Sequence, residues 1–130
     1  MPESDREFSF RLQHRMDGTG GDRPHVILLG AGPDFALEML PNLFTPRSTI
    51  GRRTLGDLKR HGLLPEEHGE RIVLRDLSIA GWRVPDIEVS VGTAASLLRV
   101  DGILGFDLFE RFGEIRFNPR TFVMTLVRDA

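Results

Sequence analysis

The side chains that could do chemistry in this 130-residue chain are few and scattered. The chain has no cysteine, which excludes thiolate metal sites, cysteine nucleophiles and disulfide bonds. It has four histidines, His14, His25, His61 and His68, and no pair of them shows a metal-ligand spacing such as HxxxH. We therefore expect no metal and no cofactor. His14 falls at an inward position of a predicted strand and is a candidate catalytic group, although a satisfied core imidazole is the alternative interpretation.

A glycine-rich segment follows the first continuous apolar run. Residues 25–29 read as a strand that is buried on both faces, and Gly30-Ala31-Gly32-Pro33-Asp34 comes directly after it. A strand followed by Gly-x-Gly also begins like a dinucleotide-binding motif. Phe35 replaces the third glycine of that motif, and the sequence after it is β-rich rather than βαβ. Dinucleotide binding therefore stays as an alternative function.

The elements that must position these residues are mostly short strands. Residues 8–16 alternate apolar and polar side chains, and short apolar runs at 72–74, 77–79, 82–84 and 87–91 are separated by Gly and Pro turns. We expect one helix at residues 54–60, capped by Thr54 and ended by Gly62, and a short one at 106–112. A hairpin over 114–127 closes the chain. The pattern predicts a single all-β domain over residues 1–130.

Composition limits the partners. The 17 Lys and Arg against 19 Asp and Glu give a net charge of −2, which offers no electrostatic footprint for nucleic acid or for an anionic membrane surface. The acidic, alternating start does not read as a signal peptide, and no apolar run approaches membrane-spanning length. We expect a cytoplasmic protein that binds neither nucleic acid nor membrane.

The last third of the chain carries the most specific pattern. The order DGILGFDLFERFGEIRFNPRTFVMTL, from Asp101 onward, resembles the end of the retropepsin-like, single-domain aspartic proteases, and the resemblance extends over residues 25–127. It implies a closed β-barrel or sandwich with crossing loops and one short C-terminal helix. It also implies that Ile103-Leu104-Gly105 packs against a loop from the first half of the domain, and that their crossing forms the catalytic platform.

In that family the partner loop is an apolar strand followed by Asp-Thr/Ser-Gly-Ala. With the strand at 25–29 in register, Gly30 takes the place of the catalytic Asp, Ala31 that of the Thr/Ser, and Gly32 that of the Gly. Glycine has no carboxyl group, so the proton-sharing acid pair cannot form. Asp34 is the second candidate catalytic residue, because it falls where retroviral members carry an Asp that lines the groove and helps to hold the dimer; a turn cap after Pro33 is its other interpretation.

These implications give one function and one further alternative. We expect a homodimer whose groove, formed by residues 30–34 and 103–105, binds a peptide-like or small-molecule ligand or supports a different reaction. The terminal strands at 8–15 and 122–127 are the candidates for pairing between two chains. The loop at 63–69 lies where the family has its flap. The alternative is an active aspartic endopeptidase that uses an acid elsewhere in the chain.

Overall fold

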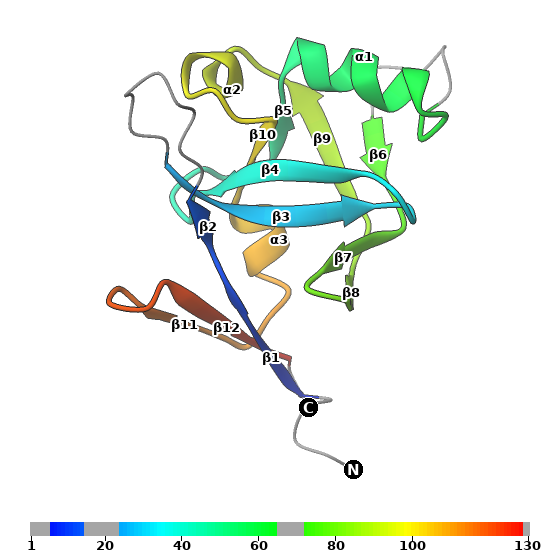
Figure 1. The fold of residues 1–130 in the computed structure, drawn as a ribbon. Coiled ribbons are helices and arrows are strands. Elements are labelled where there is room, and N and C mark those ends of the chain that lie inside the picture. The colour runs from blue at the N-terminus through cyan, green and yellow to red at the C-terminus, as the bar shows by residue number, and fades with distance from the viewer. Residues whose placement is uncertain (1–5, 15–23, 65–71, 129–130) are drawn as a thin grey trace.

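A computed structural model describes residues 6–14, 24–64 and 72–128 (Figure 1). Its strands are β1 (Glu7–Arg11), β2 (Gln13–His14), β3 (His25–Ala31), β4 (Ala36–Pro41), β5 (Thr49–Ile50), β6 (Ile72–Leu74), β7 (Leu77–Ile79), β8 (Trp82–Val84), β9 (Ile87–Val91), β10 (Gly102–Leu104), β11 (Glu114–Asn118) and β12 (Val123–Val127). Within this part of the chain the larger sheet has the order β6-β9-β5-β10-β4-β3-β7-β8, with β2 beside β3, and the smaller one has the order β1-β12-β11. The predicted all-β class is confirmed.

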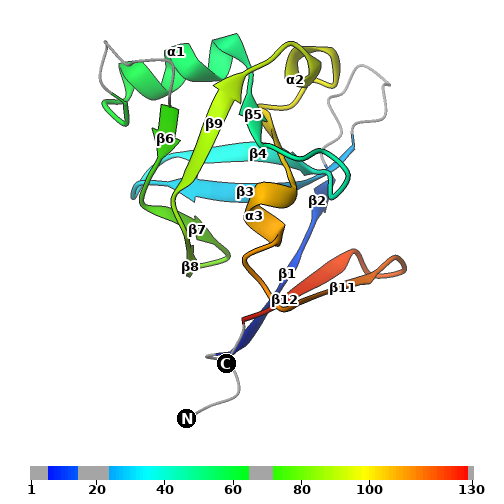
Figure 2. The same cartoon turned by 180° about the vertical axis from the view of Figure 1, so that it is seen from behind.

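Three helices lie among these strands: α1 (Arg52–Arg60), α2 (Ala94–Leu97) and α3 (Phe106–Phe109). Helices α1 and α2 lie at one end of the larger sheet, and the smaller sheet lies at the opposite end (Figures 1 and 2). The prediction for α1 was wrong at its start, because the Thr54 hydroxyl donates to the Asp101 carbonyl (2.8 Å) and does not cap the helix. Gly62, with a φ of +71°, follows the last turn as predicted.

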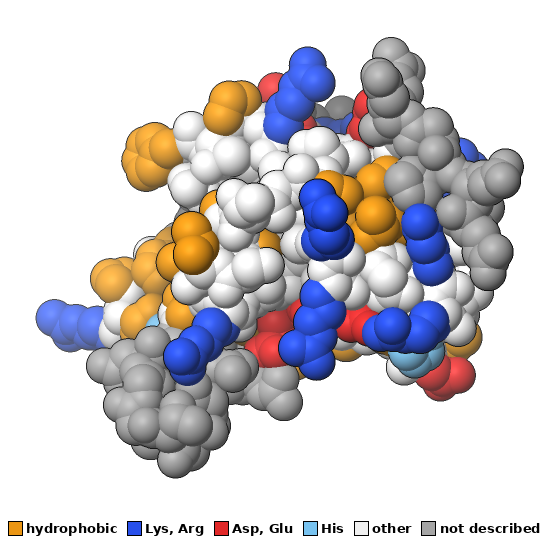
Figure 3. Space-filling model, turned by 90° about the horizontal axis from the view of Figure 1, so that it is seen from above, with side chains coloured by type: hydrophobic (Ala, Val, Ile, Leu, Met, Phe, Trp, Pro, Cys, Tyr) orange, Lys and Arg blue, Asp and Glu red, His pale blue; other side chains and the backbone are white. Residues whose placement is uncertain are grey.

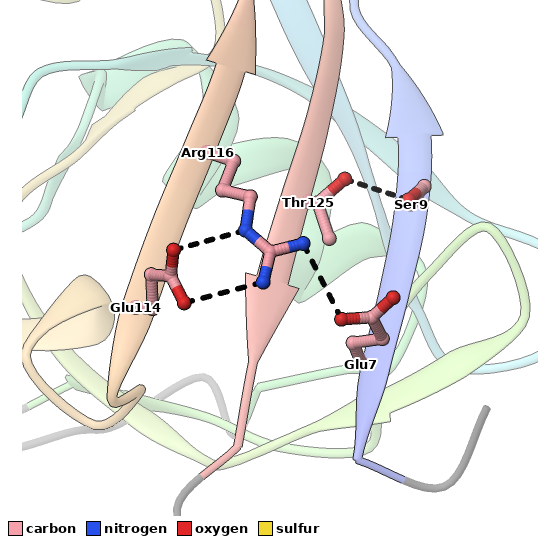
Figure 4. A network of polar contacts seen from close by, with 5 residues as sticks. All are labelled: Glu7, Ser9, Glu114, Arg116 and Thr125. Carbon is pink, nitrogen blue, oxygen red and sulfur yellow. Dashed lines mark hydrogen bonds and ion pairs between the residues drawn. The ribbon is translucent and has the colours of Figure 1, made fainter. Parts of the chain in front are cut away.

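Polar side chains on its exposed face link all three strands of the smaller sheet (Figure 4). Arg116 on β11 donates to both carboxylate oxygens of Glu114 (2.9 and 3.3 Å) and lies 3.5 Å from the Glu7 carboxylate of β1. This contact lowers the pKa of the Glu114 carboxyl and raises the pKa of the Arg116 guanidinium. The Ser9 and Thr125 hydroxyls share a hydrogen bond of 2.7 Å. Such exposed contacts support register more than stability.

The terminal strands pair within one chain. Strand β1 is antiparallel to β12 from Glu7 opposite Val127 to Arg11 opposite Val123. Of the two terminal strands predicted to pair between chains, β12 lies inside this sheet, between β1 and β11, and β1 keeps one unpaired edge among the described strands; pairing between two chains through β1 stays a prediction. In the described structure the outer edges of the smaller sheet belong to β1 and β11.

The larger sheet contains a crossing of two segments that are far apart in sequence. Strand β10 lies between β4 and β5, parallel to the first, with Leu104 opposite Pro41, and antiparallel to the second, with Gly102 opposite Ile50. The turn between β4 and β5 therefore has to pass around the end of β10. Pro41 closes β4 at the point where that strand ends, a position that a proline tolerates.

Two glycines make this crossing sterically feasible. A Cβ atom on Gly105 would lie 2.7 Å from the Thr45 carbonyl oxygen and 2.7 Å from the Arg47 carbonyl carbon. A Cβ atom on Gly102 would lie 2.5 Å from the Thr49 carbonyl oxygen. Both contacts are with backbone, which has little freedom to move away. The glycines of the Gly-Ile-Leu-Gly segment are thus required by the approach of two backbones.

A buried serine and a carboxylate fasten the same crossing. The Ser48 side chain is 0% exposed; its Oγ accepts a hydrogen bond from the Gly105 N–H (2.8 Å) and donates one to Asp107 Oδ1 (2.7 Å). The second oxygen of Asp107 accepts the Ser48 N–H (2.9 Å). The start of β5 and the start of α3 are therefore joined by charge-assisted hydrogen bonds that leave no polar atom of the serine unpaired.

Asp101 fastens the opposite end of β10. Its Oδ2 accepts the Glu38 N–H (2.7 Å) from β4, and its backbone oxygen accepts the Gly51 N–H (2.9 Å) and the Thr54 hydroxyl. Burial is the main reason that the pKa of this carboxyl lies above its ordinary value, and the negative charge of Glu38 adds to the effect. The folded state therefore holds the Asp101 proton more tightly than the unfolded chain does.

We predict that Gly105→Ala destabilises the fold by about 1–3 kcal/mol, because the new methyl group meets rigid backbone. Gly56→Ala is the matched control: nothing lies within 4 Å of a Cβ atom there, and the residue is inside α1. This control should gain about 0.5–1 kcal/mol. Urea unfolding of both variants measures the two effects, and a Gly105→Ala variant as stable as wild type would contradict the steric account.

We predict a pH-dependent effect of Asp101→Asn. A raised folded pKa means that the contribution of Asp101 is complete below its unfolded pKa and is lost as the pH rises through the folded value. Asparagine keeps an acceptor for the Glu38 N–H and does not ionise. The free energy of unfolding of the variant, relative to wild type, should therefore rise between pH 4 and pH 7, as measured by urea unfolding over that range. If the free energies of unfolding of the variant and of wild type changed in parallel with pH, burial of the Asp101 charge would carry no cost, and this prediction would be contradicted.

Candidate functional site

The crossing loop, defined here as residues 42–47, is the part of the β4–β5 turn that passes around β10. The Asn42 N–H donates to the Leu104 carbonyl (2.9 Å), and the Phe106 N–H donates to the Thr45 carbonyl (2.7 Å). The Asn42 side-chain oxygen accepts the Phe44 N–H (3.0 Å), which forms an Asx turn inside the loop. The loop is thus held at both ends by the chain that it crosses, and its conformation is fixed locally by Asn42.

The tip of this loop is apolar and exposed. The Phe44 side chain is 96% exposed and the Leu43 side chain is 39% exposed. Large apolar residues are also exposed at α2, at Leu97 and Leu98. Figure 3 shows hydrophobic side chains gathered on one side of this end of the molecule, the side toward which the β4–β5 turn and α2 project in Figure 1. An almost fully exposed phenylalanine next to a partly exposed leucine is typical of an interaction surface.

No acid belongs to the crossing loop. Between Glu38 and Asp57 the sequence contains neither aspartate nor glutamate. The carboxylates of Asp101 and Asp107 lie at the two ends of β10 and accept hydrogen bonds from Glu38, Ser48 and other groups that brace the crossing. The chemistry that the loop itself offers is that of a carboxamide, a threonine hydroxyl and Arg47.

The glycine-rich segment predicted as the site has a different role. Gly30 and Ala31 are the last residues of β3, and Gly32 begins the tight turn to β4 with a φ of +74°, closed by a hydrogen bond from the Ala31 N–H to the Phe35 carbonyl (2.8 Å). A Cβ atom on Gly30 would lie 2.6 Å from the Ser78 hydroxyl of β7. Gly30 therefore allows close packing of two strands, and the prediction that this segment meets the Ile103-Leu104-Gly105 triplet was wrong, because β10 pairs with β4 at residues 39–41.

The predicted groove is also divided by the fold. Pro33 and Asp34 are exposed in the β3–β4 turn, next to the first residue of β4. Ile103, Leu104 and Gly105 lie at the other end of β4, where Leu104 faces Pro41. Five residues of strand separate the two places, about 16 Å at 3.3 Å per residue. The structure brings the triplet together with the crossing loop, and it does not bring it to Gly30, Ala31, Gly32 or Asp34.

His14 lies on β2 and is exposed, so the inward orientation predicted for it was wrong. The alternation breaks at Leu12, which is buried, because Gln13 and His14 both face solvent after it. His14 lies opposite His25 in the β2–β3 pair. This pairing places His14 beside β3 and not beside β10 or the crossing loop. The predicted flap falls at 63–69, of which 65–69 lie outside the described residues.

Two hollows, each of about 510 Å³, flank the crossing. One borders the crossing loop at Arg47 and Ser48 and continues along β9 to the α3 region, with the lining Arg47, Ser48, Ile87, Glu88, Val89, Ser90, Asp107, Glu110 and Arg111. The other contains three carboxylates and has the lining Gln13, Leu28, Phe35, Ala36, Glu38, Asp57 and Asp101. Among the described residues, no three or more His, Cys, Asp or Glu side chains are arranged to hold a metal ion.

The sequence did not predict the crossing loop, because Pro41 and Pro46 interrupt the pattern of residues 34–61 and only the helix at 54–60 was assigned there. A usable signal existed in Phe35, Leu37 and Met39, whose period of two marks a second apolar strand. Both β3 and β4 are apolar strands followed by a turn, so pattern alone does not decide which of them adjoins the Ile-Leu-Gly triplet.

Comparison with known proteins supports the fold. No protein-family model matches the sequence, and no curated protein matches it either. Among solved structures, the crystal structure of a retropepsin-like aspartic protease from Rickettsia conorii is similar, with a TM-score of 0.57 and 17% sequence identity. The similarity covers 95% of this chain and 91% of that one. In the described part of the chain, no helix is both long enough and apolar enough to span a bilayer. The chain has the fold of the retropepsin-like aspartic proteases.

Proposed function

We propose that this chain is a single-domain, homodimeric retropepsin-like protein of the cytoplasm that lacks the aspartic dyad. Its groove binds a peptide-like or small-molecule ligand without cleaving it by the aspartic mechanism. The observation that carries the proposal is the composition of the crossing loop, which meets Ile103-Leu104-Gly105 and contains no acid. Asn42, Leu43 and Phe44 follow the apolar strand β4 in the order in which the family has Asp, Thr/Ser and Gly.

The chemical consequence follows from the side chain of Asn42. In an aspartic protease two carboxyl groups about 3 Å apart share one proton and activate water. A carboxamide does not ionise in the physiological range, so it neither shares that proton nor takes one from water. The Asn42 oxygen is also engaged by the Phe44 N–H. In a symmetric dimer both positions change together, and groups that act as one catalytic unit are strongly non-additive.

The active-endopeptidase alternative needs another acid at the crossing. Asp107 already accepts hydrogen bonds from Ser48 and from the Leu108 N–H (2.9 Å), which fixes it as part of the support. Asp101 is tied to Glu38 at the far end of β10. Neither belongs to the loop tip. The dinucleotide alternative has less support, because Gly30-Ala31-Gly32 leads into β4 where that motif requires a helix.

The dimer part of the proposal is supported by what remains exposed. A monomer would leave Phe44 almost fully in water, together with Leu43 at the same tip. Strand β11 carries Phe117, which is 44% exposed, and pairing of the outer edge of this strand across a two-fold axis would remove an unpaired edge. We propose that two copies meet through the crossing loop and this edge, which places the two Asn42 side chains near the axis.

We predict that the purified protein does not cleave a mixed peptide library at acidic or neutral pH in any pepstatin-sensitive way. The assay is mass spectrometry of the library with and without pepstatin, and an active aspartic protease treated in parallel is the positive control. Cleavage that pepstatin abolishes would defeat the proposal. Cleavage that pepstatin leaves unchanged would defeat only its binding-module form and favour a repurposed enzyme.

We predict that Phe44→Ser weakens the dimer. Burying one exposed Phe side chain is worth about 1.5–3 kcal/mol, and a symmetric interface contains it twice, so the dissociation constant should rise at least about 100-fold. Leu28→Ser, which removes an exposed apolar side chain from β3, is the matched control and should leave the dissociation constant unchanged. Sedimentation equilibrium measures both. A wild-type monomer, or equal effects of the two substitutions, would contradict the proposed interface.

A further inference from the structure

We propose that His14 and His25 form a binding site for a divalent transition-metal ion, with Cu²⁺ preferred over Zn²⁺. The two residues are eleven positions apart in sequence, a spacing that suggests no site, yet β2 and β3 place them directly opposite each other. Their ring centroids are 4.5 Å apart and the ring planes differ by 23°. Side chains directly opposite in an antiparallel pair have Cβ atoms about 4.5–5.5 Å apart, close enough for two imidazoles to share one ion.

The surroundings hold one ring and leave the other free. The second face of His25 stacks on Phe122, with centroids 3.6 Å apart and planes differing by 7°. His14 is exposed, with solvent on its outer side. Since the two rings are nearly parallel, one ion can reach a nitrogen of each only if a ring turns. The exposed His14 can make that turn at little cost while Phe122 keeps His25 in place.

The charge state of His25 suits this role. A metal ion binds the neutral form of imidazole, so a proton on the ring at neutral pH would compete with the metal ion for the nitrogen. Burial is the first cause that lowers the pKa of His25, followed by the nearby His14 and Arg11. This direction favours the neutral form of the ring, which is the form that binds a metal ion. Imidazole ligands suit Cu²⁺ and Zn²⁺, and the Irving–Williams order places Cu²⁺ first.

Two protein ligands leave the remaining positions of the ion to water. We therefore expect an exchangeable ion rather than a structural centre. The site joins β2 to β3 of the larger sheet, and β2 continues from β1 past Leu12, whose N–H donates to the Phe122 carbonyl (2.8 Å). A bound ion would thus fasten the strand that runs from the smaller sheet to the larger one (Figure 1). This effect is independent of the proposed groove.

The test is calorimetric titration of the tag-free, full-length protein with CuCl₂ and ZnCl₂ at pH 7.5. We expect one ion per chain, tighter for Cu²⁺, and a loss of affinity of at least about tenfold in His14→Ala and in His25→Phe. The phenylalanine keeps the stack on Phe122, so the second variant should stay folded. His61→Ala, which removes an imidazole beside Phe35 at the end of α1, is the matched control and should bind as wild type does.

Electron paramagnetic resonance of the Cu²⁺ complex gives a readout that a change in stability cannot imitate. Two imidazole nitrogens should split the wild-type signal, and one should remain in His14→Ala. The melting temperature of wild type should rise with added metal, and that of the two site variants should not. Undiminished affinity in either site variant, an equal loss in His61→Ala, or no binding at all would each overturn the proposal.

Discussion

Two backbone segments, residues 45–49 and 102–105, approach each other so closely that no side chain fits between them. The added methyl group of an alanine at position 102 or 105 would lie within 2.7 Å of a carbonyl group of the other segment. The hydrogen-bonding side chains of the crossing lie on either side of this contact. Ser48 and Asp107 fasten one end of it, and Asp101 fastens the other. The hydrogen bonds hold a geometry that sterics alone would allow but not enforce.

The groups that stabilise the crossing are separate from the tip of the crossing loop. The groups that build the crossing are glycines, a buried serine and two carboxylates that accept hydrogen bonds from neighbouring segments. The loop tip contributes little to this support, since Leu43 and Phe44 are exposed and only the backbone and side-chain oxygen of Asn42 are engaged. A chain can therefore keep the platform and change the residues at its tip. We propose that this chain has done so.

The strands could be predicted where the sequence is locally unambiguous. The runs at 72–74, 77–79, 82–84 and 87–91 and the closing hairpin match the structure, because alternation and Gly or Pro turns decide them within a few residues. The triplet at 103–105 was also recognised as a crossing element. Its partner was not, because β3 and β4 both end in a turn and only the pairing of Leu104 with Pro41 distinguishes them. That pairing joins residues more than 60 positions apart, beyond any local pattern. The pairing of His14 with His25 could not be predicted either, because no sequence spacing rule relates the two residues.

The most direct measurement of the central claim is the arrangement of side chains across the two-fold axis in a crystal structure of the homodimer. The account predicts that the two Asn42 residues flank the axis and that no two carboxyl groups approach within hydrogen-bond distance there. Two carboxyl oxygens that face each other across the axis at such a distance would contradict it.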